Sequence, residues 1–160
     1  MIYSGETLSV TRADNGVAHL VFDRKSESVN KFDRLAVEEL TSALDKLEAE
    51  TGVTGLIVSS AKSVFVVGAD IGEFVETFKL TDDEIAGHFS PNSDNFRRLE
   101  KLDYPVVVAI NGFALGGGLE VCLACDVRVA SEAARVGLPE TGLGIIPGWG
   151  GTARVPRIVG

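Results

Sequence analysis

Alternating apolar and polar positions open the chain and predict a β-hairpin. Residues 7–11 and 17–22 are both rich in apolar and β-branched side chains at strand spacing. The turn between them is Asp14-Asn15-Gly16, and Asn-Gly readily adopts the positive φ angles that a tight hairpin turn requires. We therefore expect two antiparallel strands, over Thr7–Thr11 and Val17–Phe22.

Between Asp33 and Glu50 the apolar residues follow a helical period instead of a strand alternation. The apolar side chains that recur there every three or four residues are Ala36, Leu40, Leu44 and Leu47. Charged residues fill positions between them, so the pattern predicts an amphipathic helix, with Gly52 as its stop. The next run, Gly55–Ser59, is short, apolar and β-branched, which is typical of a buried strand.

The middle of the chain predicts a strand end and two helices. Phe65–Asp70 has the composition of a strand that turns into a loop at Gly68, and a short helix is expected to follow through Phe78. Thr81-Asp82-Asp83-Glu84 is a capping-box sequence, which marks the start of another helix. Ser90-Pro91 predicts an interruption of that helix, because proline fits the first turn of a new helix better than a helix interior.

The last part of the chain continues the alternation of helices and strands. Phe96 and Leu99 would form the inner face of the restarted helix, which Tyr104-Pro105 ends. The elements expected after it are a strand over Val106–Ile110, a glycine turn at 116–118 with a helix to Ala124, a strand over Asp126–Ala130, a glycine-rich loop over Gly142–Gly151 and a helix over Gly151–Ile158. The fold class is therefore α/β, in one domain over residues 1–160. No closing element follows the last helix, so we expect a piece of a longer polypeptide.

Composition and charge narrow the class of protein. Hydrophobic residues make up 45% of the 160 residues, which is enough for a core of ordinary size. The net charge of −8 argues against nucleic acid as the main partner, since phosphate binding needs a basic face. Two cysteines cannot build a disulfide framework, and neither a targeting segment nor a membrane-length apolar run is visible. We expect a cytoplasmic protein with no nucleic-acid and no membrane partner.

A triple glycine within residues 111–120 (NGFALGGGLE) is the first candidate for chemistry. A strand leads into Gly116-Gly117-Gly118 and a helix leaves it, so backbone N–H groups at the helix start could stabilise an oxyanion. Glu120 lies three residues after Gly117, near whatever that N–H group holds. The simpler interpretation is a tight turn whose glutamate complements the helix dipole.

Two further glycine-containing segments supply candidate groups. Glu140 is the only acidic residue in Val136–Gly151, and a carboxyl group among apolar residues and glycines is poorly hydrated, which suits proton transfer. Glu120 and Glu140 together could form an acid/base pair, with a solvated loop glutamate as the alternative. Gly68-Ala69-Asp70 offers another backbone N–H at a strand-to-helix turn, where Asp70 has the residue type of a helix N-cap.

Two other patterns carry no site. Gly142-x-Gly144 begins like a dinucleotide-binding fingerprint, but Pro147 occupies the place of its third glycine. Cys122-x-x-Cys125 lies in an apolar helical run without the further ligands of a zinc site. We therefore interpret both thiols as core residues and expect no metal.

Three segments of the chain, taken in order, resemble the motifs of a known protein family. They are FVVGADIGEF (65–74), AINGFALGGGLEVCLACDVRVAS (109–131) and VGLPETGLGIIPGWGGTARVPRIVG (136–160). Their residues and their order resemble the crotonase, or enoyl-CoA hydratase/isomerase, superfamily, and the resemblance covers nearly the whole chain. It implies a crotonase-like spiral of ββα units. The chain is most similar to the amino-terminal region of multifunctional bacterial members, which join a hydratase/isomerase region of fatty-acid β-oxidation to a 3-hydroxyacyl-CoA dehydrogenase region.

The resemblance also implies roles for individual residues. The backbone N–H groups of Ala69 and Gly117 would form an oxyanion hole. Glu120 would deprotonate the water that attacks C3 of a trans-2-enoyl-CoA, and Glu140 would deliver a proton to C2. Substrate contacts are implied for Val67, Gly68, Asp70, Gly116, Leu143, Pro147 and Gly148. The expected reaction is hydration to a 3-hydroxyacyl-CoA, and the same two carboxyl groups could carry out Δ3-to-Δ2 enoyl-CoA isomerisation.

Partners and alternatives follow from the same resemblance. It implies an acyl-CoA thioester as substrate, no cofactor, and an oligomer in the larger protein with a thiolase subunit as a further partner. Three alternatives stay open: another acyl-CoA reaction of the superfamily such as thioester hydrolysis or decarboxylation, acyl-CoA binding without catalysis, and an NAD-dependent dehydrogenase. Glutamine variants of Glu120 and Glu140 would distinguish catalysis from binding alone.

Overall fold

Strands and helices alternate along the computed structural model, which describes residues 1–77 and 79–160. The strands are β1 (Tyr3–Ser4), β2 (Leu8–Arg12), β3 (Val17–Phe22), β4 (Gly55–Ser60), β5 (Val106–Ile110), β6 (Phe113–Leu115), β7 (Val127–Ala130) and β8 (Arg135–Gly137). The helices are α1 (Arg34–Ala49), α2 (Ile71–Thr77), α3 (Asp82–Glu100), α4 (Gly117–Leu123) and α5 (Gly151–Val159), with a 3-10 turn, η1, over Glu140–Leu143.

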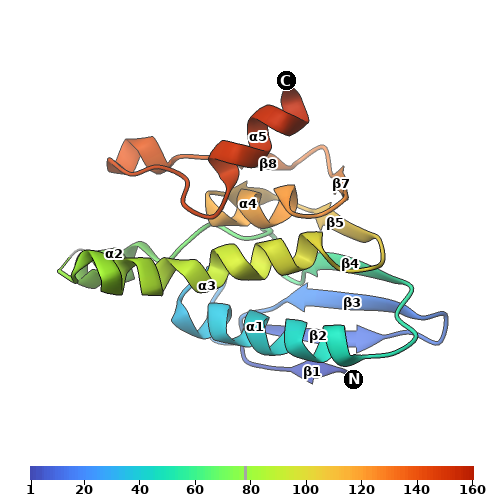
Figure 1. The fold of residues 1–160 in the computed structure, drawn as a ribbon. Helices are drawn as coiled ribbons and strands as arrows, with labels where there is room; N and C mark the ends of the chain where they lie inside the picture. The colour runs from blue at the N-terminus through green and yellow to red at the C-terminus, as the bar shows by residue number, and fades with distance from the viewer. Residues whose placement is uncertain (78) are drawn as a thin grey trace.

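A six-stranded sheet forms the base of the molecule, in the order β1-β2-β3-β4-β5-β7. Strands β1 to β3 pair antiparallel, whereas β3, β4, β5 and β7 run parallel. The two short strands β6 and β8 form a separate parallel pair. Helices α1 and α3 lie side by side over one face of the large sheet, and α4 lies near its β5–β7 end, with α5 packed against α4 (Figure 1). In the part of the chain that the structure describes, no helix has the length and apolar character needed to cross a membrane.

Most of the predicted elements are confirmed. The hairpin pairs β2 with β3 through a turn in which Gly16 has a φ of +86°. The helix predicted between Asp33 and Glu50 is α1, and Asp33 caps it by accepting a hydrogen bond from the Ala36 N–H. Thr81 and Glu84 form the reciprocal capping box of α3. Local sequence therefore determines where these elements begin.

Two local predictions are wrong. The predicted interruption at Ser90-Pro91 does not occur, since α3 continues unbroken through Pro91. Pro91 cannot donate to the carbonyl of Gly87, but Gly87 is exposed and water can bind that carbonyl instead. The segment 65–70 forms isolated bridges, at Val66 and at Ala69, rather than the end of a regular strand. The predicted helix end at Phe78 lies outside the described residues.

An aromatic cluster connects the sheet to the loops above it. Its members pack edge to face with ring centroids 5.7 to 6.1 Å apart, and they are Phe22, Phe32, Phe65, Phe96 and Trp149. Edge-to-face pairs of this kind stabilise beyond the area that they bury. Cys122 and Cys125 belong to the same buried core, which confirms their interpretation as core residues.

A buried glutamate fixes the N-terminal segment to α1. The Glu39 carboxylate accepts hydrogen bonds from the Glu6 N–H (2.8 Å), the Thr7 N–H (2.8 Å) and the Thr7 hydroxyl (2.6 Å). Gly5 permits this approach, because a Cβ there would lie 2.2 Å from Glu39 Oε2. Burial alone would raise the pKa of Glu39, but the hydrogen bonds outweigh it and the pKa is lowered. The ionised carboxylate therefore stabilises the fold.

We predict that Glu39→Gln lowers the free energy of unfolding at pH 7 by about 1.5–3 kcal/mol, the range for hydrogen bonds to a charged group. Because the pKa of Glu39 is lowered on folding, its contribution is complete above the pKa of the unfolded chain. It is lost as the pH falls through the folded pKa, so the variant and the wild type should converge in acid. Urea denaturation at several pH values measures both effects.

Glu38→Gln is the matched control for this measurement. Glu38 is the neighbouring residue on α1, and its exposed side chain forms a 3.9 Å ion pair with Arg34. Exposed pairs of this type contribute little to stability, so no measurable change is expected. Equal losses in the two variants, or a loss in Glu39→Gln that persists in acid, would contradict the role assigned to Glu39.

Candidate active site

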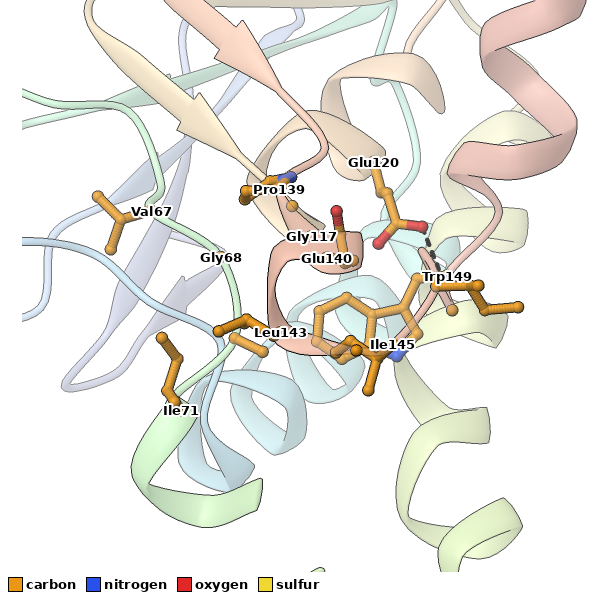
Figure 2. A pocket seen from close by; sticks show the side chains of 15 residues that line it. Val67, Gly68, Ile71, Gly117, Glu120, Pro139, Glu140, Leu143, Ile145 and Trp149 are labelled. Carbon is orange, nitrogen blue, oxygen red and sulfur yellow. Dashed lines mark hydrogen bonds between the residues drawn. The ribbon is translucent and has the colours of Figure 1, made fainter. Parts of the chain in front are cut away.

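A cavity of about 560 Å³ opens where the loop after β4, the start of α4, η1 and the loop before α5 meet. Its wall is largely apolar. The apolar side chains that line it include Ala69 and Ile146, together with Val67, Ile71, Pro139, Leu143, Ile145 and Trp149, which are labelled in Figure 2. Glu120 and Glu140 also line it. An apolar cleft with a few convergent polar groups is the usual form of a small-molecule site.

Two glycine turns pack against each other at the cavity wall. Gly68 and Gly116 both have positive φ angles, +107° and +52°. A Cβ at Gly68 would lie 3.1 Å from the Leu115 carbonyl oxygen, so side chains at these positions would hold the turns apart. The residues that follow the two glycines, Ala69 and Gly117, line the cavity.

The N–H groups of Ala69 and Gly117 have no hydrogen-bond acceptor within residues 1–77 and 79–160. The peptide groups around Ala69 are fixed, since the Phe32 N–H donates to the Gly68 carbonyl (2.8 Å) and the Asp70 N–H donates to the Phe32 carbonyl (3.0 Å). Gly117 is the first residue of α4, where N–H groups have no acceptor within the helix. Two N–H groups in the wall of one cavity are what stabilisation of an oxyanion requires.

Glu120 lies in the first turn of α4 with only 1% of its surface exposed. Its Oε1 atom accepts a hydrogen bond from the Trp149 N–H (2.9 Å; Figure 2) and another from the Gly151 N–H (2.8 Å). Burial raises the pKa of Glu120; the two hydrogen bonds oppose this shift, and the nearby charge of Glu140 adds to it. With Oε1 held in this way, Oε2 is the oxygen that can interact with a ligand in the cavity.

Glu140 is the first residue of η1 and lies next to the triple glycine. A Cβ at Gly116 would be 3.0 Å from Glu140 Oε1, which shows how closely the carboxyl group approaches that turn. Its Oε2 atom is buried and makes no hydrogen bond with the part of the chain that the structure describes. Both glutamates singled out from the sequence thus lie at the same cavity, with oxygens available for proton transfer.

The structure separates the implied substrate contacts into two groups. Those that line the cavity are Val67, Gly68, Gly116, Leu143 and Gly148. Asp70 and Pro147 do not line it. Asp70 accepts a hydrogen bond from the Gly72 N–H (2.9 Å) and forms an ion pair with Lys31 (2.9 Å), and Lys31 lowers the pKa of Asp70. Pro147 packs near Gly151 instead.

Some cavity residues were not identified from the sequence. Ile71, Pro139, Ile145 and Ile146 belong to the apolar wall, and Ile146 is 72% exposed. The pair Ile145-Ile146 within a glycine-rich loop was an available signal, because exposed apolar side chains in a loop often mark a binding surface.

Cysteine chemistry is disfavoured at Cys122 on α4 and at Cys125 just after this helix. Burial raises the pKa of Cys122 well above its usual value and that of Cys125 to about 12. Thiols held in the neutral form are poor nucleophiles and poor metal ligands. Among the residues that the structure describes, no three His, Cys, Asp or Glu side chains are grouped as metal ligands.

We predict that Gly117→Ala displaces the Trp149 ring, because the new Cβ would lie 2.2 Å from the ring atom Cζ3. Overpacking of this kind costs about 1–3 kcal/mol in the free energy of unfolding. Trp149 is the only tryptophan of the chain, so its fluorescence emission reports the displacement directly. Gly142→Ala is the control, since no atom lies within 4 Å of its added Cβ. Unchanged emission in Gly117→Ala would refute the predicted close contact.

Comparison with known proteins assigns the chain to a family of enzymes. A family model described as enoyl-CoA hydratase/isomerase matches residues 12–160. The chain is 55% identical, over its whole length, to the fatty acid oxidation complex subunit alpha of Pseudomonas putida and of Pseudomonas aeruginosa. It spans 22% of the length of these curated relatives.

Solved structures agree on the fold. An enoyl-CoA hydratase from Bacillus anthracis is 37% identical with a TM-score of 0.85, and the match covers 96% of this chain and 58% of that one. An enoyl-CoA hydratase from Shewanella pealeana is 27% identical with a TM-score of 0.88, over 96% of this chain and 57% of that one. The prediction of a crotonase-like α/β fold is confirmed. Since the family match includes all three segments that build the cavity, the chain belongs to the enoyl-CoA hydratase/isomerase family.

Proposed function

We propose that this chain adds water across the double bond of a trans-2-enoyl-CoA thioester to give the 3-hydroxyacyl-CoA. One observation carries the proposal: two carboxyl groups, from α4 and η1, line the same apolar cavity as two N–H groups without protein acceptors in the described residues. An apolar acyl chain suits the cavity wall, and the thioester carbonyl suits the two donors.

The N–H groups would act on the charge that develops during addition. Attack of water at C3 moves electrons through the conjugated system to the thioester oxygen and forms an enolate. Hydrogen bonds from Ala69 and Gly117 to that oxygen would stabilise the enolate more than the neutral thioester. A single donor of this type contributes about 2.7–4 kcal/mol to transition-state stabilisation.

The two carboxyl groups would divide the proton transfers. Glu120, anchored through Oε1, would accept a proton from water through Oε2 while the water oxygen bonds to C3. Glu140 would then donate a proton to C2 as the enolate collapses. The elements of one water molecule are added across C2 and C3, and proton exchange with solvent restores both carboxyl groups.

The names of the relatives support a wider setting for this reaction. We propose a role in fatty-acid β-oxidation, because the curated relatives are subunits of a fatty acid oxidation complex, and we expect the chain to act in the cytoplasm. We expect an oligomeric assembly with a thiolase subunit as a partner. The same pair of carboxyl groups could move a proton between C2 and C4, so Δ3-to-Δ2 isomerisation is a second candidate activity.

Replacing either carboxyl group should stop hydration. We expect Glu120→Gln and Glu140→Gln each to lower kcat for crotonyl-CoA hydration by about 10²–10⁴-fold, the usual contribution of a general acid or base. The loss of the conjugated enoyl-thioester absorbance measures turnover, and calorimetric titration with the product thioester measures binding. Glu132→Gln, a change at an exposed glutamate, is the control. Wild-type protein that binds acyl-CoA but never turns over would leave only the binding role.

The pH dependence of hydration should report Glu120. Burial raises the pKa of this carboxyl group, and a general base works only when it is ionised. The acidic limb of kcat/KM should therefore lie above the ordinary pKa of glutamate, and activity should rise as the pH increases through it. A limb at or below the ordinary glutamate pKa would rule out Glu120 as the base.

A further inference from the structure

Arg154 makes an unusual set of contacts behind the cavity. It lies in the first turn of α5, and its side chain is only 12% exposed. Its guanidinium donates two hydrogen bonds to the Glu100 carboxylate at the end of α3, through Nε (2.6 Å) and Nη2 (2.8 Å). A third, from Nη1, goes to the Trp149 carbonyl (2.8 Å). One side chain thus fixes the loop before α5 relative to α3.

That loop holds the carboxylate proposed as the general base. The N–H groups of Trp149 and Gly151 both donate to Glu120 Oε1. The Trp149 residue is therefore held on both sides, with its N–H on Glu120 and its carbonyl on Arg154. Gly150 between them has a φ of +106°, and a Cβ there would lie 2.1 Å from Arg154 Nη1. The guanidinium lies directly against the backbone of the loop.

Few charged groups face the Glu120 carboxylate. Glu140, from η1, raises the pKa of Glu120, and Arg154, from α5, lowers it. Glu100 partly neutralises the positive charge of Arg154, and Arg154 in turn lowers the pKa of Glu100, with Arg97 on α3 acting in the same direction. Arg154 therefore affects Glu120 in two ways, through the loop backbone and through its charge.

We infer that Arg154 is a positioning residue that holds residues 149–151 around the Glu120 carboxylate, and that Glu100 sets how much positive charge Arg154 presents to it. The inference rests on the proposed function, in which Glu120 is the base. Arg154 touches neither the cavity nor a reacting atom, so its effect must pass through Glu120 and the two N–H groups that hold it.

Three substitutions separate geometry from charge. Arg154→Met removes both the hydrogen bonds and the positive charge. It should lower kcat for crotonyl-CoA hydration by about 10²-fold, the usual effect of shifting a catalytic group by roughly 1 Å, with a smaller change in KM. It should also move the acidic limb of kcat/KM to higher pH. Arg154→Lys keeps the charge without the planar fork, so the limb should stay near its wild-type position while kcat recovers only in part. Glu100→Gln should move the limb to lower pH.

Arg98→Met is the matched control. Arg98 forms a similar two-pronged ion pair, from α3 to Glu48 on α1, and has no contact with the cavity. The Arg98→Met variant should unfold at a lower urea concentration, while the acidic limb of its kcat/KM profile stays at the wild-type pH. If Arg154→Met loses stability in the same way and leaves the limb in place, Arg154 is a structural residue and the inference fails. Should Arg154→Met not fold, Glu100→Gln decides, and an unmoved limb overturns the inference.

A second readout keeps this test independent of turnover. The carboxyl carbon of Glu120 can be titrated by NMR in protein labelled with ¹³C-glutamate, with Glu120→Gln providing the assignment. Arg154→Met should raise the titration midpoint and Glu100→Gln should lower it. If wild-type protein does not hydrate crotonyl-CoA, the proposed function fails while these shifts still support the positioning role. Midpoints that stay unchanged in both variants overturn it.

Discussion

Close backbone approach at the triple glycine is the constraint on which the site depends. A Cβ at Gly118 would lie 2.0 Å from the Val66 carbonyl oxygen, and one at Gly117 would lie 2.2 Å from the Trp149 ring. Only residues without side chains let α4 begin so close to both segments. This approach buries Glu120 and brings the peptide groups of Ala69 and Gly117 into one cavity wall.

The Glu120 carboxylate is buried, and hydrogen bonds from its surroundings offset much of the free energy that its desolvation costs. Removing an ion from water costs several kcal/mol, whereas each hydrogen bond to a charged group returns about 1.5–3 kcal/mol. The two N–H donors of the loop therefore offset much of the cost but not all of it, since the pKa of Glu120 stays above its usual value. The desolvation cost that remains makes the carboxylate more basic, which suits the general-base role proposed for Glu120.

The sequence predicted the local features of the fold, and the two glutamates that line the cavity, better than the long-range contacts that hold the cavity wall in place. The hairpin, the capped helices and the pair Glu120 and Glu140 follow from residues close together in the chain. Strands β6 and β8 have three residues each, too few to show a period. The contact of Arg154 with Glu100 joins residues 54 positions apart, so only tertiary packing creates it. The predicted interruption at Pro91 was wrong because the effect of a proline on a helix depends on whether the carbonyl four residues earlier can be hydrated, which the local sequence does not show.

Two buried thiols, Cys122 on α4 and Cys125 just after it, offer a way to measure how often this part of the core opens. Cys122 lies on the helix that carries Glu120 and Cys125 lies two residues after its end; both are buried, and their raised pKa values keep them unreactive while this segment is packed. A thiol reagent can modify them only when α4 leaves the core. The rate of labelling therefore counts the openings of this one helix, and a ligand that holds the cavity closed should slow that rate in proportion to its occupancy.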